Sequence, residues 1–84
     1  MNELEQQPEL LLSLEALIFA SDTPMSVARL QQALGNTYSS ADIRQYLQQL
    51  AVLQHGRSIE LVKTAQGFRF QVRAKYQPII TQAW

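Results

Sequence analysis

The side chains that most often carry enzyme chemistry are nearly absent from this sequence. His55 is the single histidine among 84 residues, and there is no cysteine. An activated nucleophile needs a neighbouring base, and a zinc site needs several nitrogen or sulfur ligands, so a lone histidine completes neither. We expect His55 to lie in solvent at a helix end beside Gly56, where a positive charge favours the C-terminal dipole. The sequence predicts no enzyme, cofactor, metal site or small-molecule substrate.

Ser21, Asp22 and Ser26 form a second polar group, around Pro24. Short polar side chains of this kind bind free backbone amides at helix ends, and capping accounts for all three. Ser26 is the expected N-cap of the helix that follows.

Residues 41–54 and the strands after them offer some chemistry for DNA recognition. Glutamine can bind adenine through two hydrogen bonds, and arginine neutralises phosphate. Arg44 is the only arginine on this helix, and Asp42 lies beside it, so the electrostatic attraction to a polyanion is small. Contact with nucleic acid is expected to be at most weak and non-specific, and its candidates are Arg44, Gln48, Arg69 and Arg73.

The formal net charge is zero, but the charges are unevenly distributed along the chain. Residues 1–42 hold six acids and Arg29, whereas residues 43–84 hold six bases and Glu60. Glu15 interrupts the most apolar segment, and the acidic N-terminus has the wrong polarity for a secretory signal. We expect an intracellular soluble protein without a membrane segment.

The elements that must position these residues are predicted from hydrophobic periodicity. Residues 9–20, 27–34 and 41–54 have the spacing of amphipathic helices. Their expected inward residues are Leu10, Leu11, Leu14, Leu17, Ile18, Val27, Leu30, Leu34, Ile43, Tyr46, Leu47, Leu50 and Leu53. Ser26 and either Ser39 or Ser40 are the expected N-caps, and Gly35 and Gly56 end the second and third helices.

Beyond Gly56 the period changes from 3.6 to 2, which is typical of a strand buried on one side. Phe68, Phe70 and Val72 alternate with polar residues, 59–65 is the expected partner strand, and Gln66-Gly67 is the expected turn. Tyr76, Ile79, Ile80 and Ala83 are spaced as a short helix with Pro78 in its first turn.

This order predicts one mainly α domain with a small β hairpin, a winged helix-turn-helix with three helices, a two-stranded wing and a short C-terminal helix. The domain should span residues 9–84 after a flexible N-terminal lead-in, residues 1–8.

The first helix has more apolar surface than one buried face requires. Leu12, Ala16 and Phe19 form a second stripe, which makes them the candidates for a self-association interface. The alternative is that the sheet and the last helix cover this stripe. Further candidates for a partner surface are Val52, Tyr38, Tyr76 and Trp84, because aromatic side chains are enriched at interfaces.

Two segments carry a resemblance to a known family. E-A-L-I-F-A-S-D-T-P-M-S (15–26) and S-I-E-L-V-K-T-A-Q-G-F-R-F-Q-V-R-A-K-Y (58–76) resemble the helix and hairpin motifs in the N-terminal half of the segregation and condensation protein B family. Gln66, Phe68 and Phe70 depart from the family's usual glycine, tyrosine and leucine but keep the strand pattern.

The resemblance implies a cytoplasmic, nucleoid-associated, non-catalytic subunit of the bacterial condensin complex. Such a protein acts in chromosome condensation and partition, and hence in the cell cycle and cell division, with a kleisin subunit and an SMC ATPase. It also implies a homodimer formed by this first domain, and a second winged-helix domain that this chain lacks, so we expect a fragment. The alternative function is a winged-helix DNA-binding transcriptional regulator.

Overall fold

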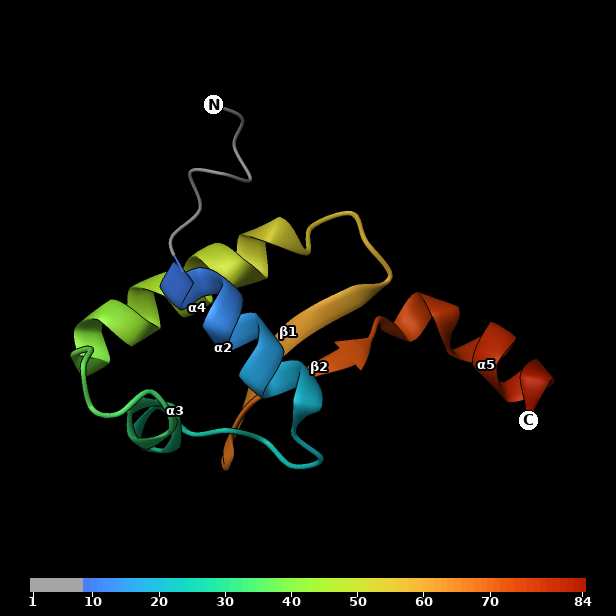
Figure 1. The fold of residues 1–84 in the computed structure, drawn as a ribbon. Helices are drawn as coiled ribbons and strands as arrows, with labels where there is room; N and C mark the ends of the chain where they lie inside the picture. The colour runs from blue at the N-terminus through green and yellow to red at the C-terminus, as the bar shows by residue number, and fades with distance from the viewer. Residues whose placement is uncertain (1–8) are drawn as a thin grey trace.

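The computed structural model describes residues 9–84, and the prediction of a flexible lead-in at residues 1–8 lies outside them. Its elements, in chain order, are α2 (Glu9–Ala20), α3 (Val27–Ala33), α4 (Ser40–Leu53), β1 (Ile59–Thr64), β2 (Gly67–Val72), a 3-10 turn η1 (Ala74–Tyr76) and α5 (Gln77–Ala83) (Figure 1). The predicted winged-helix order of three helices, a hairpin and a short helix is confirmed.

Side-chain caps start α3 and α4 where the sequence predicts them. The Ser26 hydroxyl accepts a hydrogen bond from the Arg29 amide at 3.1 Å. Ser39, rather than Ser40, caps α4 and accepts from the Asp42 amide at 3.0 Å. Gly35 follows α3 with φ +74°, a left-handed conformation that favours glycine, so the chain can leave the helix there without a Cβ clash.

The hairpin pairs β1 and β2 in antiparallel register, with Leu61 opposite Phe70 and Val62 opposite Arg69. Opposed residues share a face, so Leu61, Phe68 and Phe70 point to the helices and pack on the core. The predicted turn is wrong by one residue. Ala65 and Gln66 form the turn, whereas Gly67 is already paired with Thr64.

The loop before α3 forms an isolated antiparallel bridge with β2, between Met25 and Phe68. The Met25 and Phe68 backbones exchange two hydrogen bonds, each 2.8 Å long. Gly67 passes so close that a Cβ atom on it would lie 2.4 Å from the Met25 carbonyl carbon. With φ at +140°, this position requires glycine for both its conformation and its contact.

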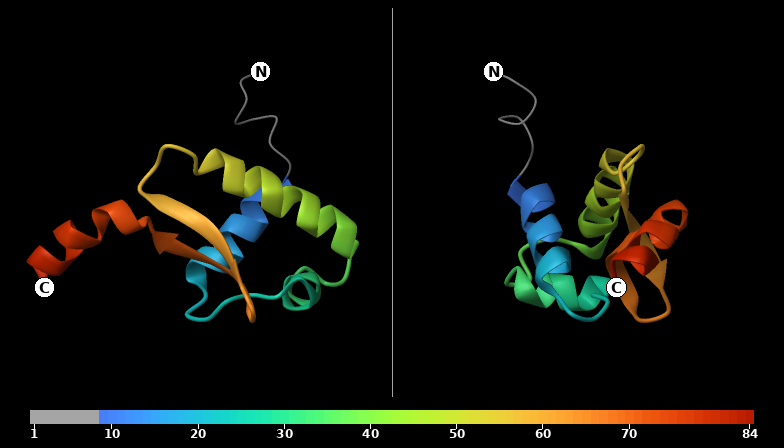
Figure 2. Two further views of the ribbon diagram at one scale, coloured as in Figure 1. Left: turned by 180° about the vertical axis from the view of Figure 1, so that it is seen from behind. Right: turned by 90° about the vertical axis from the view of Figure 1, so that its right-hand side faces the viewer.

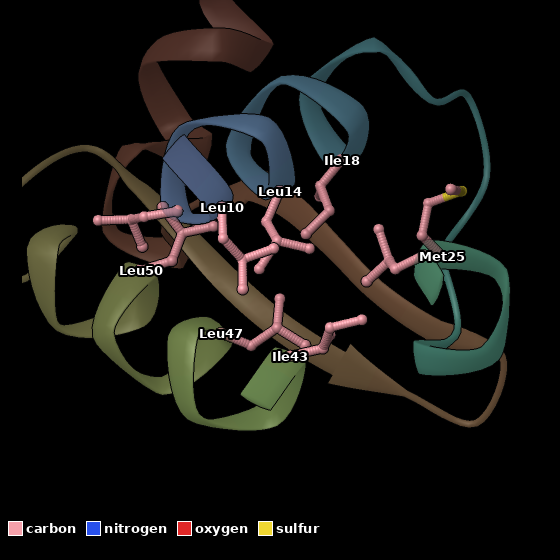
Figure 3. Packing of buried hydrophobic residues seen from close by; sticks show 9 residues of the cluster. Leu10, Leu14, Ile18, Met25, Ile43, Leu47 and Leu50 are labelled. Atoms are coloured by element: carbon pink, nitrogen blue, oxygen red, sulfur yellow. The ribbon is translucent and has the colours of Figure 1, made fainter. Parts of the chain in front are cut away.

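The core lies between α2, α4 and the inner face of the hairpin, and Figure 3 shows its side chains converging from these elements. In the side view of Figure 2, α2 and α4 lie together on one side of the hairpin. The buried residues are Leu10, Leu11, Leu14, Ile18, Met25, Leu30, Ile43, Leu47 and Leu50. Leu17, Val27, Leu34 and Tyr46 pack against them and are partly buried.

One sequence prediction about the core is corrected. Leu53, expected to face inward, is 46% exposed because α4 ends there, beyond the last turn that faces α2. The short helix α5 forms as predicted but buries no residue, and it extends away from the helices (Figures 1 and 2).

Arg73 joins the end of β2 to the end of α4. Its Nη2 and Nε atoms donate to the carbonyls of Gln54 and Arg57, each at 2.7 Å. Its Nη1 atom lies 3.4 Å from Glu60 Oε1, and its backbone amide donates to the Ser58 carbonyl. A cation bound to free carbonyls at a helix C-terminus stabilises that end of the helix.

Candidate protein-interaction surface

The most extensive apolar concavity that involves α2 is a groove between this helix, the end of α4 and the hairpin. We call it the apolar groove, and its volume is about 610 Å³. Its lining residues are Leu11, Leu12, Glu15, Ala16, Phe19, Leu50, Leu53, Gln54, Arg57, Ile59 and Phe70. All three candidates for the self-association interface, Leu12, Ala16 and Phe19, therefore lie together along one wall.

These wall residues are open to solvent. Leu12 is 42% exposed, Phe19 is 80% exposed, and Ala16 is also exposed. The alternative that the sheet and the last helix cover the stripe is wrong, because Leu12, Ala16 and Phe19 remain exposed and α5 packs mainly against η1. Contiguous exposed apolar surface of this kind usually marks an interaction site.

A second depression continues the groove across α4. It is lined by Leu11 and Leu53, which it shares with the apolar groove, and by Val52 with three glutamines. Val52, predicted as part of a partner surface, is exposed, and it lines this depression beside the apolar groove.

The other three predicted partner residues are not brought together with Val52. Tyr38 is partly buried against the core, and its carbonyl accepts a hydrogen bond from Gln31 Nε2. Tyr76 lies in η1 with Lys75 Nζ 5.2 Å from its ring centre. Trp84 is 94% exposed at the end of α5.

The candidates for DNA contact do not form one surface. Arg44 and Gln48 line a groove of about 570 Å³ between α4 and the hairpin tip, together with Lys63. Arg69 lies elsewhere, on the outer strand face, where its Nη2 donates to Gln71 Oε1. Arg73 is half-buried and bonded within the chain, so its guanidinium is not free to face a phosphate.

His55 is exposed in the turn after α4, as predicted. Residues 9–84 contain no group of three or more metal-ligating side chains placed to hold an ion. In the same part of the chain, every helix is too short or too polar to cross a bilayer.

Of the polar group around Pro24, Ser26 caps α3, whereas Ser21 bonds to Thr23 within its own turn and Asp22 is simply exposed. The prediction that capping explains all three is therefore correct only for Ser26.

Sequence reasoning missed three residues of the apolar groove: Leu53, Ile59 and Phe70. Leu53 and Phe70 were assigned to buried faces from their periodicity, and Ile59 was assigned only to the partner strand. Periodicity identifies the apolar side of an element, but it does not show where the neighbouring element stops covering that side. The position of Leu53 in the last turn, close to Gly56, was the one available signal.

Comparison with known proteins gives one consistent result. The family model described as "Segregation and condensation complex subunit ScpB" matches residues 12–84. A segregation and condensation protein B homologue from Coxiella burnetii is 34% identical over 73 residues, which cover 84% of this chain and 35% of the homologue.

Solved structures agree with this assignment. ScpB from Mycobacterium tuberculosis superposes with a TM-score of 0.81 at 30% identity, over 89% of this chain and 47% of that one. A conserved hypothetical protein from Chlorobium tepidum gives 0.79 at 28% identity, over 95% and 51%. A dimer of the ScpB N-terminal domain complexed with ScpA peptide shares the fold, with a TM-score of 0.78 at 21% identity over 93% of both chains.

The chain thus spans about a third to a half of the length of the first two of these relatives. Because the family model covers nearly all of the residues that the structure describes, the chain belongs to the ScpB family of segregation and condensation complex subunits.

Proposed function

We propose that this chain is a non-catalytic self-association domain of a bacterial condensin complex, acting in chromosome condensation and segregation. The observation that carries the proposal is the exposure of Phe19 and Leu12 along one wall of the apolar groove. A single copy of this domain leaves that wall in water, and a second copy can cover it.

The energetics favour a symmetric dimer. Covering a large apolar side chain contributes roughly 1.5–3 kcal/mol. In a two-fold dimer each contact occurs twice, so Leu12, Phe19 and Leu53 would each contribute from both copies. A neutral chain also has no net charge repulsion to overcome when it associates with itself.

The partners in the proposal follow from family membership. A kleisin subunit and an SMC ATPase are the partners expected of the assembled complex, at the nucleoid in the cytoplasm. The solved ScpB N-terminal domain, which is similar in extent to this chain, is a dimer complexed with ScpA peptide. Pull-down of the cognate kleisin with this chain, beside the longer natural protein, would test whether this domain alone makes that contact.

Sedimentation equilibrium of three proteins tests self-association. Wild type should be dimeric in the micromolar range, Phe19→Asp should be monomeric, and Gln32→Asp should be dimeric. Gln32 is the matched control because it is exposed on α3, away from the apolar groove. Circular dichroism should show all three folded, since Phe19 contributes little to the core. Wild type that remains monomeric throughout, or two variants that dimerise equally well, would contradict the proposal.

A DNA-binding regulator is the second candidate, because Arg44 and Gln48 lie exposed on α4 in the groove that also holds Lys63. The two functions differ in their salt dependence. A regulator should bind duplex DNA tightly with a steep salt slope, whereas an interaction domain should show little binding at physiological salt. Tight, sequence-selective binding lost in Arg44→Gln would favour the regulator.

A further inference from the structure

The C-terminal helix α5 is an apolar segment without a buried surface in its own chain. Residues 77–84 carry no charge, and they include Pro78, Ile79, Ile80 and Trp84. Ile79 is 67% exposed and Trp84 is 94% exposed. Among the described residues, α5 packs chiefly against the η1 turn that precedes it, and Figure 1 shows it extending from the hairpin away from α2 and α4.

Hydrogen bonds at the base of α5 fix the direction in which it leaves the hairpin. The Arg73 amide donates to the Ser58 carbonyl at 2.8 Å, and the Arg73 side chain is bonded to Gln54, Arg57 and Glu60. The Tyr76 amide then donates to the Arg73 carbonyl at 3.0 Å, which closes η1 directly before α5. Folding α5 back onto its own chain would require a different backbone path after Arg73.

The apolar groove matches α5 in length and chemistry. Its α2 wall spans Leu12 to Phe19, eight residues along the helix, and α5 is seven residues long. Both therefore extend roughly 10 Å at the rise of an α-helix. Apolar side chains line most of the groove, with Glu15 and Arg57 as its charged members, and an uncharged helix brings no further charge that would have to be buried there.

We propose that α5 of one copy occupies the apolar groove of a second copy, and that the exchange is reciprocal. The inference rests on the proposed self-association and specifies the contact that produces it. An apolar helix laid into a groove is a common mode of recognition, and two-fold symmetry makes the contact twice. The exchange covers two of the exposed apolar surfaces of the described residues, the α2 wall and α5.

Trp84 provides a direct readout, because it is the only tryptophan in the chain. As wild type associates, Trp84 emission should shift to the blue and acrylamide quenching should fall, in step with the dimer fraction measured by sedimentation. Ile79→Asp on α5 and Phe19→Asp in the groove should each weaken dimerisation by at least about tenfold and keep the emission at its solvent-exposed wavelength. Gln82→Asp, on the same helix, is the matched control for added charge at an exposed position.

Disulfide trapping tests whether α5 of one chain reaches the apolar groove of another. Because the sequence contains no cysteine, a cross-link can form only between the introduced residues. Leu53→Cys and Ile79→Cys are prepared as separate proteins, mixed and oxidised. The mixture should form the cross-linked heterodimer much faster than a mixture of Gln32→Cys with Ile79→Cys, because Gln32 lies outside the groove.

The outcomes separate this inference from the proposed function. A dimer in which Trp84 stays exposed, or in which both cysteine mixtures react equally, overturns the helix exchange while self-association stands. Burial of Trp84 that does not depend on concentration also overturns it, because α5 would then occupy the groove of its own chain. A wild type that never dimerises removes the proposed function itself.

Discussion

Replacing Gly67 with alanine should destabilise the domain severely although it adds only one methyl group. The new Cβ would lie 2.4 Å from the Met25 carbonyl carbon and 2.5 Å from both the Met25 oxygen and the Ser26 nitrogen. All three are backbone atoms, so no side-chain rotation relieves the overlap. The loop before α3 must move away from the hairpin, and the two hydrogen bonds between Met25 and Phe68 are lost.

The expected loss can be worked from these contacts. Two backbone hydrogen bonds contribute about 0.5–1.5 kcal/mol each, and an unfavourable backbone conformation costs about 1–3 kcal/mol. Their sum is roughly 2–6 kcal/mol, against a total stability of roughly 4–13 kcal/mol for a domain of this length. At about 4–8 °C per kcal/mol, the melting temperature should fall by at least about 8 °C.

Thermal denaturation followed by circular dichroism measures this loss, with Gly56→Ala as the matched control. Gly56 also has a positive φ, +76°, but a Cβ there meets nothing within 4 Å. Its substitution should therefore cost only the conformational term, about 1–2 kcal/mol. If Gly67→Ala melts at the same temperature as Gly56→Ala, the close approach of Met25 to the hairpin does not exist and the reasoning is refuted.

Three further substitutions test how the surface is positioned, each by chemical denaturation. Arg73→Gln should lower the free energy of unfolding by about 1–3 kcal/mol, since it removes charged hydrogen bonds to the end of α4, whereas the exposed Arg69→Gln should change it by less than about 0.5 kcal/mol. Equal effects would show that Arg73 does not join the strand to the helix. Ser39→Ala should cost about 1 kcal/mol through loss of the α4 cap, and no change would mean that another group satisfies the Asp42 amide. Leu50→Ala should cost about 2–5 kcal/mol because Leu50 is buried, whereas Leu53→Ala should mainly weaken dimerisation. A loss of stability larger for Leu53→Ala than for Leu50→Ala would show that Leu53 belongs to the core.

Much of the fold was predictable because the capping residues, the glycines and the hydrophobic periodicity agree with the observed helices, strands and burial. The caps at Ser26 and Ser39, the glycine after α3 and the change of period after Gly56 all lie where the sequence predicts them. The apolar stripe of Leu12, Ala16 and Phe19 was also visible, since a helix that is apolar on two sides needs more cover than a small domain offers.

The remaining features depend on how elements meet, which periodicity does not encode. Leu53 and Ile79 have the spacing of core residues, yet α4 runs past its neighbour and α5 leaves the body. Arg73 reads as a solvent-facing cation in an alternating strand, but the end of α4 comes within its reach. The bridge between Met25 and Phe68 had no sequence signal apart from Gly67, which was assigned to the turn.

Intermolecular nuclear Overhauser effects in a dimer of labelled and unlabelled chains test the central claim most directly. The account predicts cross-chain signals to the side chains of Leu12, Ala16, Phe19 and Leu53, with Ile79 and Trp84 as their sources. Cross-chain signals confined to the outer face of the hairpin or to Arg44 and Gln48, with none at the apolar groove, would contradict it.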